Sequence, residues 1–254
     1  MCTDKSMDIL PECSSVSRRE MMTKKEILDA IHGKMIISCQ AVEGEPLYVE
    51  EKSIMYLMAR AAKQAGTPAI RTSSIRDVIA IKEETGLPVI GLVKIQYLGY
   101  EGYITPTMKE VDDLVAAGSD VVALDCTLRK RGDGSTVNEF IAQIKEKYPD
   151  IILMADISNY EEGINAWKCG VDIVGTTMSG YTDYTSKKDE PDYELMERLA
   201  KDTDIPVIGE GKIHYPDQAV KALQTGVWAI VVGGAITRPL EIAQRFQKAI
   251  ENSK

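Results

Sequence analysis

The chain has 254 residues, of which 44% are hydrophobic and 27% are charged, and its formal net charge is −9. This length is typical of one large globular domain. The negative charge argues against nucleic acid or an anionic membrane as the main partner, because neither would be attracted to the chain. The sequence contains no apolar run near the roughly 20 residues that cross a bilayer. Its first residues also lack the basic start and apolar core of a signal peptide.

The cysteine and histidine content restricts the redox and metal chemistry that we expect. Five cysteines are spread without Cys-x-x-Cys spacing, and an odd number in a chain of this size favours reduced thiols in the cytoplasm. Only two histidines are present, His32 and His214, so a histidine-rich metal site is excluded. A magnesium site with oxygen ligands stays open, although no motif indicates one.

The N-terminal part divides at about residue 22. Residues 1–22 are polar and rich in methionine, and we expect them to form a disordered or loosely attached extension. Thr23 and Glu26 then have the spacing of a capping box, which predicts a short helix that ends at Gly33. In a barrel, such a helix could cover the bottom of the strands.

The rest of the chain repeats one pattern, in which a unit of two apolar strands and two helices recurs four times. Several strands follow a proline and others follow a glycine, and the first crossover helix is expected over residues 51–64. Strand–helix alternation predicts parallel strands, and equally short, apolar strands favour a closed ring over an open sheet. We therefore predict a TIM (β/α)8 barrel with a short N-terminal helix, and residues 23–254 as one catalytic domain. The first strand is expected at residues 35–38, and the second is a short strand that ends at residue 71. The other six are expected at residues 87–94, 117–125, 148–156, 169–177, 205–212 and 225–234.

Polar or glycine residues follow each predicted strand, at the end of the barrel where active sites gather. They are Gln40, Arg71, Lys94, Asp125, Asp156, Thr176 with Thr177, Glu210, and Gly233 with Gly234. Asp125 and Asp156 have a second interpretation as loop caps or as ion-pair partners of Arg71 or Lys94. Arg71 could be purely structural, and Thr177 could be a backbone cap. These alternatives stay open at this point.

Lys94 and Glu210 are the residues whose chemistry is hardest to explain structurally. Lys94 follows an apolar strand, and burial lowers the pKa of a lysine until its amine can act as a base or form a Schiff base. Glu210 lies between two glycines in a loop that we expect to bind an anion. Two titratable groups in different environments predict an acid/base pair.

The last two strands predict a phosphate site. Each ends in glycines and is followed by a helix start, and glycines let backbone N–H groups approach an anion closely. The candidate residues are Gly211, Lys212, Gly233, Gly234 and Arg238. The loop over residues 178–182, which contains Tyr181, has the hydroxyls and glycine that could contact a sugar.

Several phrases together resemble the N-acetylmannosamine-6-phosphate 2-epimerases of sialic-acid catabolism. The phrases are SCQA at residues 38–41, YITPTMKEV at 103–111, ALD at 123–125, MADIS at 154–158, TTMSGYT at 176–182 and VVGGAITRP at 231–239. The likeness begins near Gly33 and runs to the C-terminus. This sequence differs from the family pattern in its N-terminal extension and at Ile95. It also has Lys212 at a position where arginine is common in the family.

This resemblance implies interconversion of N-acetylmannosamine 6-phosphate and N-acetylglucosamine 6-phosphate in the cytoplasm, without a metal or organic cofactor. It implies catalytic roles for Lys94 and Glu210, and substrate contacts for Gln40, Arg71, Asp125 and Arg238. A homodimer is also implied. Two alternatives stay open, namely a lyase that uses Lys94 as a Schiff base and a barrel that binds a phosphosugar without catalysis.

Overall fold

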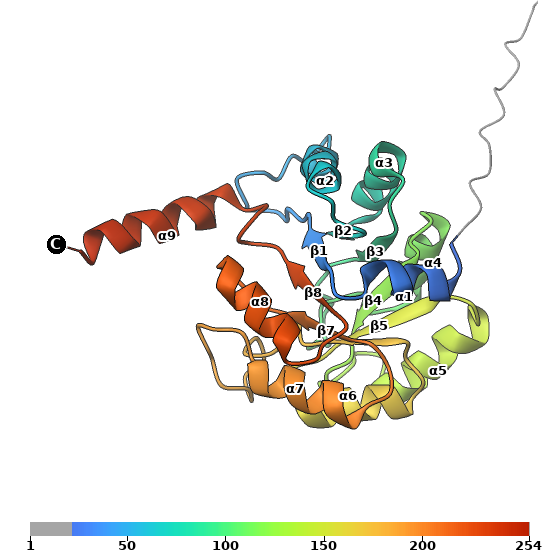
Figure 1. The fold of residues 1–254 in the computed structure, drawn as a ribbon. Coiled ribbons are helices and arrows are strands. Elements are labelled where there is room, and N and C mark those ends of the chain that lie inside the picture. Colours follow the sequence, from blue (N-terminus) through green and yellow to red (C-terminus); the bar gives the residue numbers. More distant parts are fainter. Residues whose placement is uncertain (1–21, 254) are drawn as a thin grey trace, which may run out of the picture.

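The computed structural model describes residues 22–253, which form a closed barrel of eight parallel strands (Figure 1). The strands are β1 Met35–Ser38, β2 Ile70–Ser73, β3 Val89–Leu92, β4 Val121–Asp125, β5 Ile152–Asp156, β6 Ile173–Gly175, β7 Val207–Glu210 and β8 Ala229–Val232. Each strand pairs with its neighbours in chain order, and β8 closes the ring by pairing with β1. The predicted TIM barrel is therefore confirmed. The expected extension over residues 1–22 lies outside the described residues except for Met22, so the domain boundary stays a prediction.

Helices alternate with the strands along the described chain. They are α1 Lys24–Ile31, α2 Met55–Gln64, α3 Ile75–Thr85, α4 Met108–Ala116, α5 Val137–Lys147, α6 Tyr160–Lys168, α7 Tyr193–Asp202, α8 Pro216–Gln224 and α9 Pro239–Glu251. Capping boxes begin several of them, including the predicted one at Thr23 and Glu26. None of the helices in residues 22–253 combines the length and the apolar character that a membrane crossing requires.

Two layers of apolar side chains hold the barrel together, because successive strand residues point to opposite faces. Residues such as Ile90, Met154 and Val231 pack inside the ring. Their neighbours in sequence, such as Val89 and Ile230, pack between the ring and the helices. Helix α1 contributes Ile27 and Ile31 to the interior cluster, which confirms that the short N-terminal helix covers one end of the strands.

Several predicted boundaries were wrong. Strands β3 to β8 are shorter than the ranges expected from the sequence, and two further differences concern α2 and β2. Helix α2 begins at Met55 and not at residue 51, because Ser53 forms a turn in which its hydroxyl accepts the backbone N–H of Met55. Strand β2 continues two residues past Arg71 to Ser73, because Thr72 and Ser73 pair with β3. Arg71 therefore lies within a strand, with a side chain that is 1% exposed.

Helix α9 differs from the other helices that follow a strand. It extends away from the barrel in Figure 1, and none of its residues is buried. Its first turn nevertheless lies beside the carboxyl ends of the strands, where Arg238 is the residue before the helix.

Candidate active site

The alternation of strand residues brings the predicted site residues into the mouth of the barrel. Ile90 and Leu92 point into the interior, and Lys94 continues the same two-residue series beyond the end of β3. Ile208 and Glu210 form the corresponding series on β7. Each strand thus carries apolar residues at depth and a polar residue or glycine at the rim. This arrangement builds a polar site on top of an apolar core.

A cavity of about 270 Å³ opens at this end of the barrel. Eleven of the thirteen predicted site residues line it, namely Gln40, Arg71, Lys94, Thr177, Tyr181, Glu210, Gly211, Lys212, Gly233, Gly234 and Arg238. Asp125 and Asp156 do not line it. The cavity therefore brings the candidate acid/base pair and the candidate phosphate loops together.

Arg71 is the centre of a buried ionic cluster at the base of the cavity. Its Nη2 atom donates to Oδ2 of Asp156 at 2.6 Å, and both side chains are almost fully buried. Its Nε atom lies 3.4 Å from Oε2 of Glu210. Thr177 donates its hydroxyl to Asp156 at 2.6 Å and is 3.1 Å from Oε2 of Glu210. These contacts fix the position of the Glu210 carboxylate.

Burial and neighbouring charges change the proton affinity of Lys94 and Glu210. Burial lowers the pKa of Lys94 to about 8, with a further decrease from the cations Arg238 and Arg71 and a partial opposing effect from Glu210. Burial raises the pKa of Glu210, and the nearby Asp156 raises it further, although Arg71, Thr177 and Lys94 oppose the change. Both pKa values therefore move toward neutrality, where acid/base catalysis is most effective.

Two buried polar atoms at the cavity have no hydrogen-bond partner within the described residues. They are Oε1 of Gln40 and Nε of Arg71, the latter because its approach to Glu210 does not have hydrogen-bond geometry. Gln40 lines the cavity, and its amide nitrogen donates to the Ser38 hydroxyl at 2.8 Å, which leaves the amide oxygen without a partner. Leaving buried polar atoms without hydrogen bonds costs free energy, so binding of a polar ligand that hydrogen-bonds to both atoms would be favoured.

The glycine pair after β8 forms one wall of the cavity together with Arg238. Gly233 lies against Ser38 of β1, where an added Cβ would be 3.2 Å from the Ser38 Cβ atom. The carbonyl oxygen of Gly233 accepts from the backbone of Ile236 and Thr237, which closes a tight turn before α9. Arg238 forms ion pairs with Glu45 at 3.1 Å and with Glu241 at 2.9 Å.

Lys212 lies in the cavity wall but has protein partners of its own. Its Nζ atom donates to the carbonyl oxygen of Ser179 at 2.9 Å and lies 4.9 Å from the centre of the Tyr181 ring. Its backbone has a φ of 59°, which is uncommon for a residue with a Cβ. Lys212 therefore connects the loop after β7 to the loop after β6.

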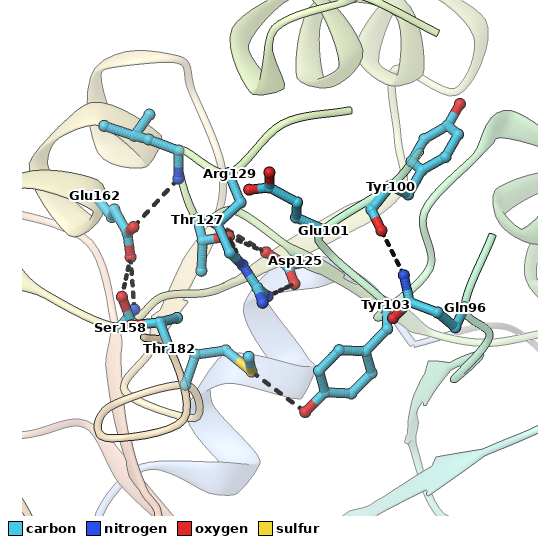
Figure 2. A network of polar contacts seen from close by, with 12 residues as sticks. Gln96, Tyr100, Glu101, Tyr103, Asp125, Thr127, Arg129, Ser158, Glu162 and Thr182 are labelled. Atoms are coloured by element: carbon cyan, nitrogen blue, oxygen red, sulfur yellow. Dashed lines mark hydrogen bonds and ion pairs between the residues drawn. The ribbon is translucent and has the colours of Figure 1, made fainter. Parts of the chain in front are cut away.

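Asp125 belongs to a polar network beside the cavity (Figure 2). Arg129 donates to its carboxylate at 2.6 Å, and the hydroxyl of Thr127 donates to the same carboxylate at 2.5 Å. Asp156 pairs with Arg71, which is one of the interpretations left open above. Substrate contacts from these two aspartates stay predictions.

Sequence reasoning missed several residues that line the cavity. They are Ser38, Ile104, Ile213, His214, Val231, Thr237 and Glu241. The two-residue series on β1 could have identified Ser38, since it lies between Ile36 and Gln40. Tyr103 comes from the long loop after β3, and its hydroxyl lies 3.8 Å from Sδ of Met178 (Figure 2).

Known proteins resemble this chain in sequence and in structure. The family model "Putative N-acetylmannosamine-6-phosphate epimerase" matches residues 55–252. A protein from Caldanaerobacter subterraneus named "Putative N-acetylmannosamine-6-phosphate 2-epimerase" is 52% identical over 90% of this chain and 96% of its own. A solved structure of the N-acetylmannosamine-6-phosphate 2-epimerase from Clostridium perfringens is 48% identical, with a TM-score of 0.83, over 88% of this chain and 96% of that one.

A second solved structure shows the fold alone. Thiamine phosphate pyrophosphorylase from Pyrococcus furiosus is 20% identical, with a TM-score of 0.56, over 89% of this chain and 98% of that one.

Fold and site together define a (β/α)8-barrel enzyme whose candidate acid/base residues line the same cavity as glycine-rich loops at the carboxyl ends of the strands. The match to the family model covers more than half of the chain, and the relatives are matched over nearly their whole length. The chain belongs to the N-acetylmannosamine-6-phosphate epimerase family.

Proposed function

We propose that this protein is an isomerase that interconverts N-acetylmannosamine 6-phosphate and N-acetylglucosamine 6-phosphate in sialic-acid catabolism. One observation supports the mechanism most directly. Lys94 follows β3 and Glu210 ends β7, and these strands are four positions apart in a ring of eight. The two groups therefore approach the cavity from opposite sides of the barrel. An epimerisation needs a proton removed from one face of a carbon and returned to the other.

The chemistry of the sugar fits this arrangement. In the open-chain form, C2 lies next to the C1 carbonyl, so the carbanion left by proton removal is delocalised onto oxygen as an enolate. We propose that Lys94 exchanges the C2 proton on one face and Glu210 on the other. Because the substrate's own carbonyl stabilises the carbanion, side chains suffice for this reaction, and we propose that no metal or organic cofactor takes part.

The remaining polar residues would orient the sugar and stabilise charge. Arg71 and Gln40 have the unpaired Nε and Oε1 atoms described above, so we propose that they hydrogen-bond to the open-chain sugar. A guanidinium beside the developing enolate oxygen would supply electrostatic stabilisation. Thr177 and Tyr181 would contact sugar hydroxyls, and Asp156 would hold Arg71 in place through its 2.6 Å ion pair.

The 6-phosphate would bind at the other end of the cavity. We propose that the backbone N–H groups of Gly211, Gly233 and Gly234 surround it, with positive charge from Arg238 and Lys212. These residues line the same cavity as Lys94. A phosphate fixed there would hold C2 at a constant position relative to the acid/base pair, which lowers the entropic part of the barrier.

The two other functions raised by the sequence are not favoured. The relatives are named as epimerases and not as lyases. A lyase would form an imine on Lys94, and borohydride would trap it with substrate present. A barrel that only binds a phosphosugar would not need a lysine with a pKa of about 8 opposite a buried glutamate.

Proton NMR of N-acetylmannosamine 6-phosphate in D2O tests the proposed reaction. We expect N-acetylglucosamine 6-phosphate to appear with deuterium at C2, because the proton passes through groups that exchange with solvent. Conversion with complete retention of the C2 proton would contradict the two-group scheme. If neither conversion nor exchange occurs, the proposed function is wrong.

We also propose that the protein is a homodimer held by α9. Ile242, Phe246, Ala249 and Ile250 recur at helical spacing and form an apolar stripe, yet no residue of α9 is buried. Within residues 22–253 this apolar stripe is not covered, and a helix of 13 residues without apolar packing is marginally stable in water. In a barrel, the helix after β8 packs outside β8 and β1, between α8 and α2. In Figure 1, α9 points away from that place, so we propose that the α9 of a second copy packs there.

Size-exclusion chromatography with light scattering tests this proposal. We expect a mass of about twice 28.0 kDa for the unaltered chain. Phe246→Asp combined with Ile250→Asp should produce a monomer, because it places charge on the apolar stripe. Gln244→Asp adds one charge to the polar side of the same helix and should leave the dimer intact. A monomeric unaltered chain, or a double variant that stays dimeric, would rule the interface out.

The partners and the location follow from the same chemistry. We propose a cytoplasmic protein, and the free thiols of Cys39, Cys126 and Cys169 support this because cytoplasmic thiols stay reduced. The net charge of −9 supports a small anionic substrate bound by local cations, with neither nucleic acid nor membrane as a partner.

A further inference from the structure

Glu241 places a negative charge in the region that we assign to the substrate phosphate. It is an acidic residue in the first turn of α9, and it lines the same cavity as Gly233, Gly234 and Arg238. Its Oε1 atom lies 2.9 Å from Arg238, and its other carboxylate oxygen lies against Gly234, where a Cβ atom would force the carboxylate to move. The carboxylate therefore occupies the space between a glycine backbone and a guanidinium, which is the environment that a phosphate requires.

Other contacts hold the start of α9 in this position. Arg245, one turn beyond Glu241, donates to the carbonyl oxygen of Gly234 at 3.2 Å and lies 3.4 Å from Nδ1 of His214. Arg238 is also paired with Glu45 at 3.1 Å, so two carboxylates share one guanidinium. A phosphate dianion cannot reach Arg238 and Gly234 while the Glu241 carboxylate remains there, because like charges repel at short range.

We propose that Glu241 is a specificity-determining residue that occupies the phosphate position in the free enzyme and is displaced by the phosphate of the substrate. This inference rests on the proposed function, because it assumes that Gly233, Gly234 and Arg238 bind the phosphate. A phosphorylated sugar replaces the ion pair that it breaks with a stronger one. A neutral sugar breaks that ion pair without replacing it. Glu241 therefore weakens the binding of all ligands and favours phosphorylated ones.

Glu241→Gln tests this role, because it keeps the size of the side chain and removes its charge. We expect the inhibition constant of inorganic phosphate, and the KM for N-acetylmannosamine 6-phosphate, to decrease by about three- to tenfold, the range for removing one nearby, partly screened charge. The kcat should change by less than about twofold, because the charge acts on binding and not on the acid/base pair. Glu251→Gln, the same change at the exposed far end of α9, is the matched control.

The sign of the change distinguishes this role from a structural one. If Glu241 merely orients Arg238, Glu241→Gln will weaken phosphate binding and raise KM, which would overturn the inference. Unchanged constants would overturn it as well. Failure of the phosphate assignment itself looks different. In that case inorganic phosphate does not compete with substrate in the unaltered enzyme, and Arg238→Ala leaves KM unchanged, whereas a correct assignment predicts a clear rise in KM for Arg238→Ala.

Discussion

Lys94→Met should reduce kcat by about a thousandfold or more, because it removes the group that we propose exchanges the C2 proton on one face of the sugar. The methionine side chain retains the length of lysine without its amine, so phosphosugar binding should be largely preserved. The measurement is the initial rate of conversion, followed by NMR. Lys168→Met, at an exposed position on α6, is the matched control and should retain full activity. Near-normal turnover in Lys94→Met would remove the lysine from the mechanism.

The pH dependence of the unaltered enzyme gives an independent check on Lys94. In a two-group mechanism, Lys94 and Glu210 together hold one proton in the active state, because one group releases a proton while the other accepts one. Burial lowers the pKa of Lys94 to about 8 and raises that of Glu210. The kcat/KM should therefore fall as the pH rises through about 8, where the pair loses its proton, and fall again in acid as Glu210 becomes protonated. A kcat/KM that rises through pH 8 would favour Lys94 as the only base.

Glu210→Gln should have the second-largest effect, with a loss in kcat of about a hundredfold to ten-thousandfold. The amide fills the same space beside Arg71 and Thr177 but does not exchange a proton at C2. Lys94 remains, so one of the two epimers should still exchange its C2 proton with D2O although it no longer converts. In Lys94→Met, exchange should persist only in the other epimer. This reciprocal pattern is specific to two groups on opposite faces.

Mass spectrometry of each purified epimer, incubated with each variant in D2O, would reveal the pattern. Glu197→Gln, at an exposed position on α7, is the matched control and should convert both epimers normally. Loss of exchange from both epimers in Glu210→Gln would mean that the glutamate acts at another step, such as ring opening. Full conversion in Glu210→Gln would exclude it from catalysis.

The sequence predicts the barrel and the position of the two candidate proton-transfer residues because both depend on local order. Short apolar strands alternate with helices, and the alternation of side chains along β3 and β7 carries Lys94 and Glu210 into the mouth. These signals lie within a few residues of one another. Parallel pairing of consecutive strands then brings the strand ends together without further information.

Contacts between distant segments could not be predicted in this way. Arg71 could pair with several carboxylates, and only the folded ring shows that it pairs with Asp156, which is 85 residues away. The contact of Asp125 could not be predicted either, although its partner Arg129 is only four residues away. Arg129 lies in an irregular loop, where no periodic pattern indicates the direction of a side chain. The position of Glu241 depends on how α9 leaves the barrel, and the sequence of α9 alone does not specify that direction.

The separation of rim and interior along each strand has a consequence for how this barrel can change during evolution. Leu92 and Lys94 are two residues apart, but one contributes to the packing of the interior and the other faces the cavity. A substitution at the rim can therefore alter the chemistry without disturbing the packing below it. A single-residue insertion between them would instead turn the residue at the rim to the outer face of the ring. We expect related barrels to diversify by exchanging rim residues, while the number of residues in each strand stays constant.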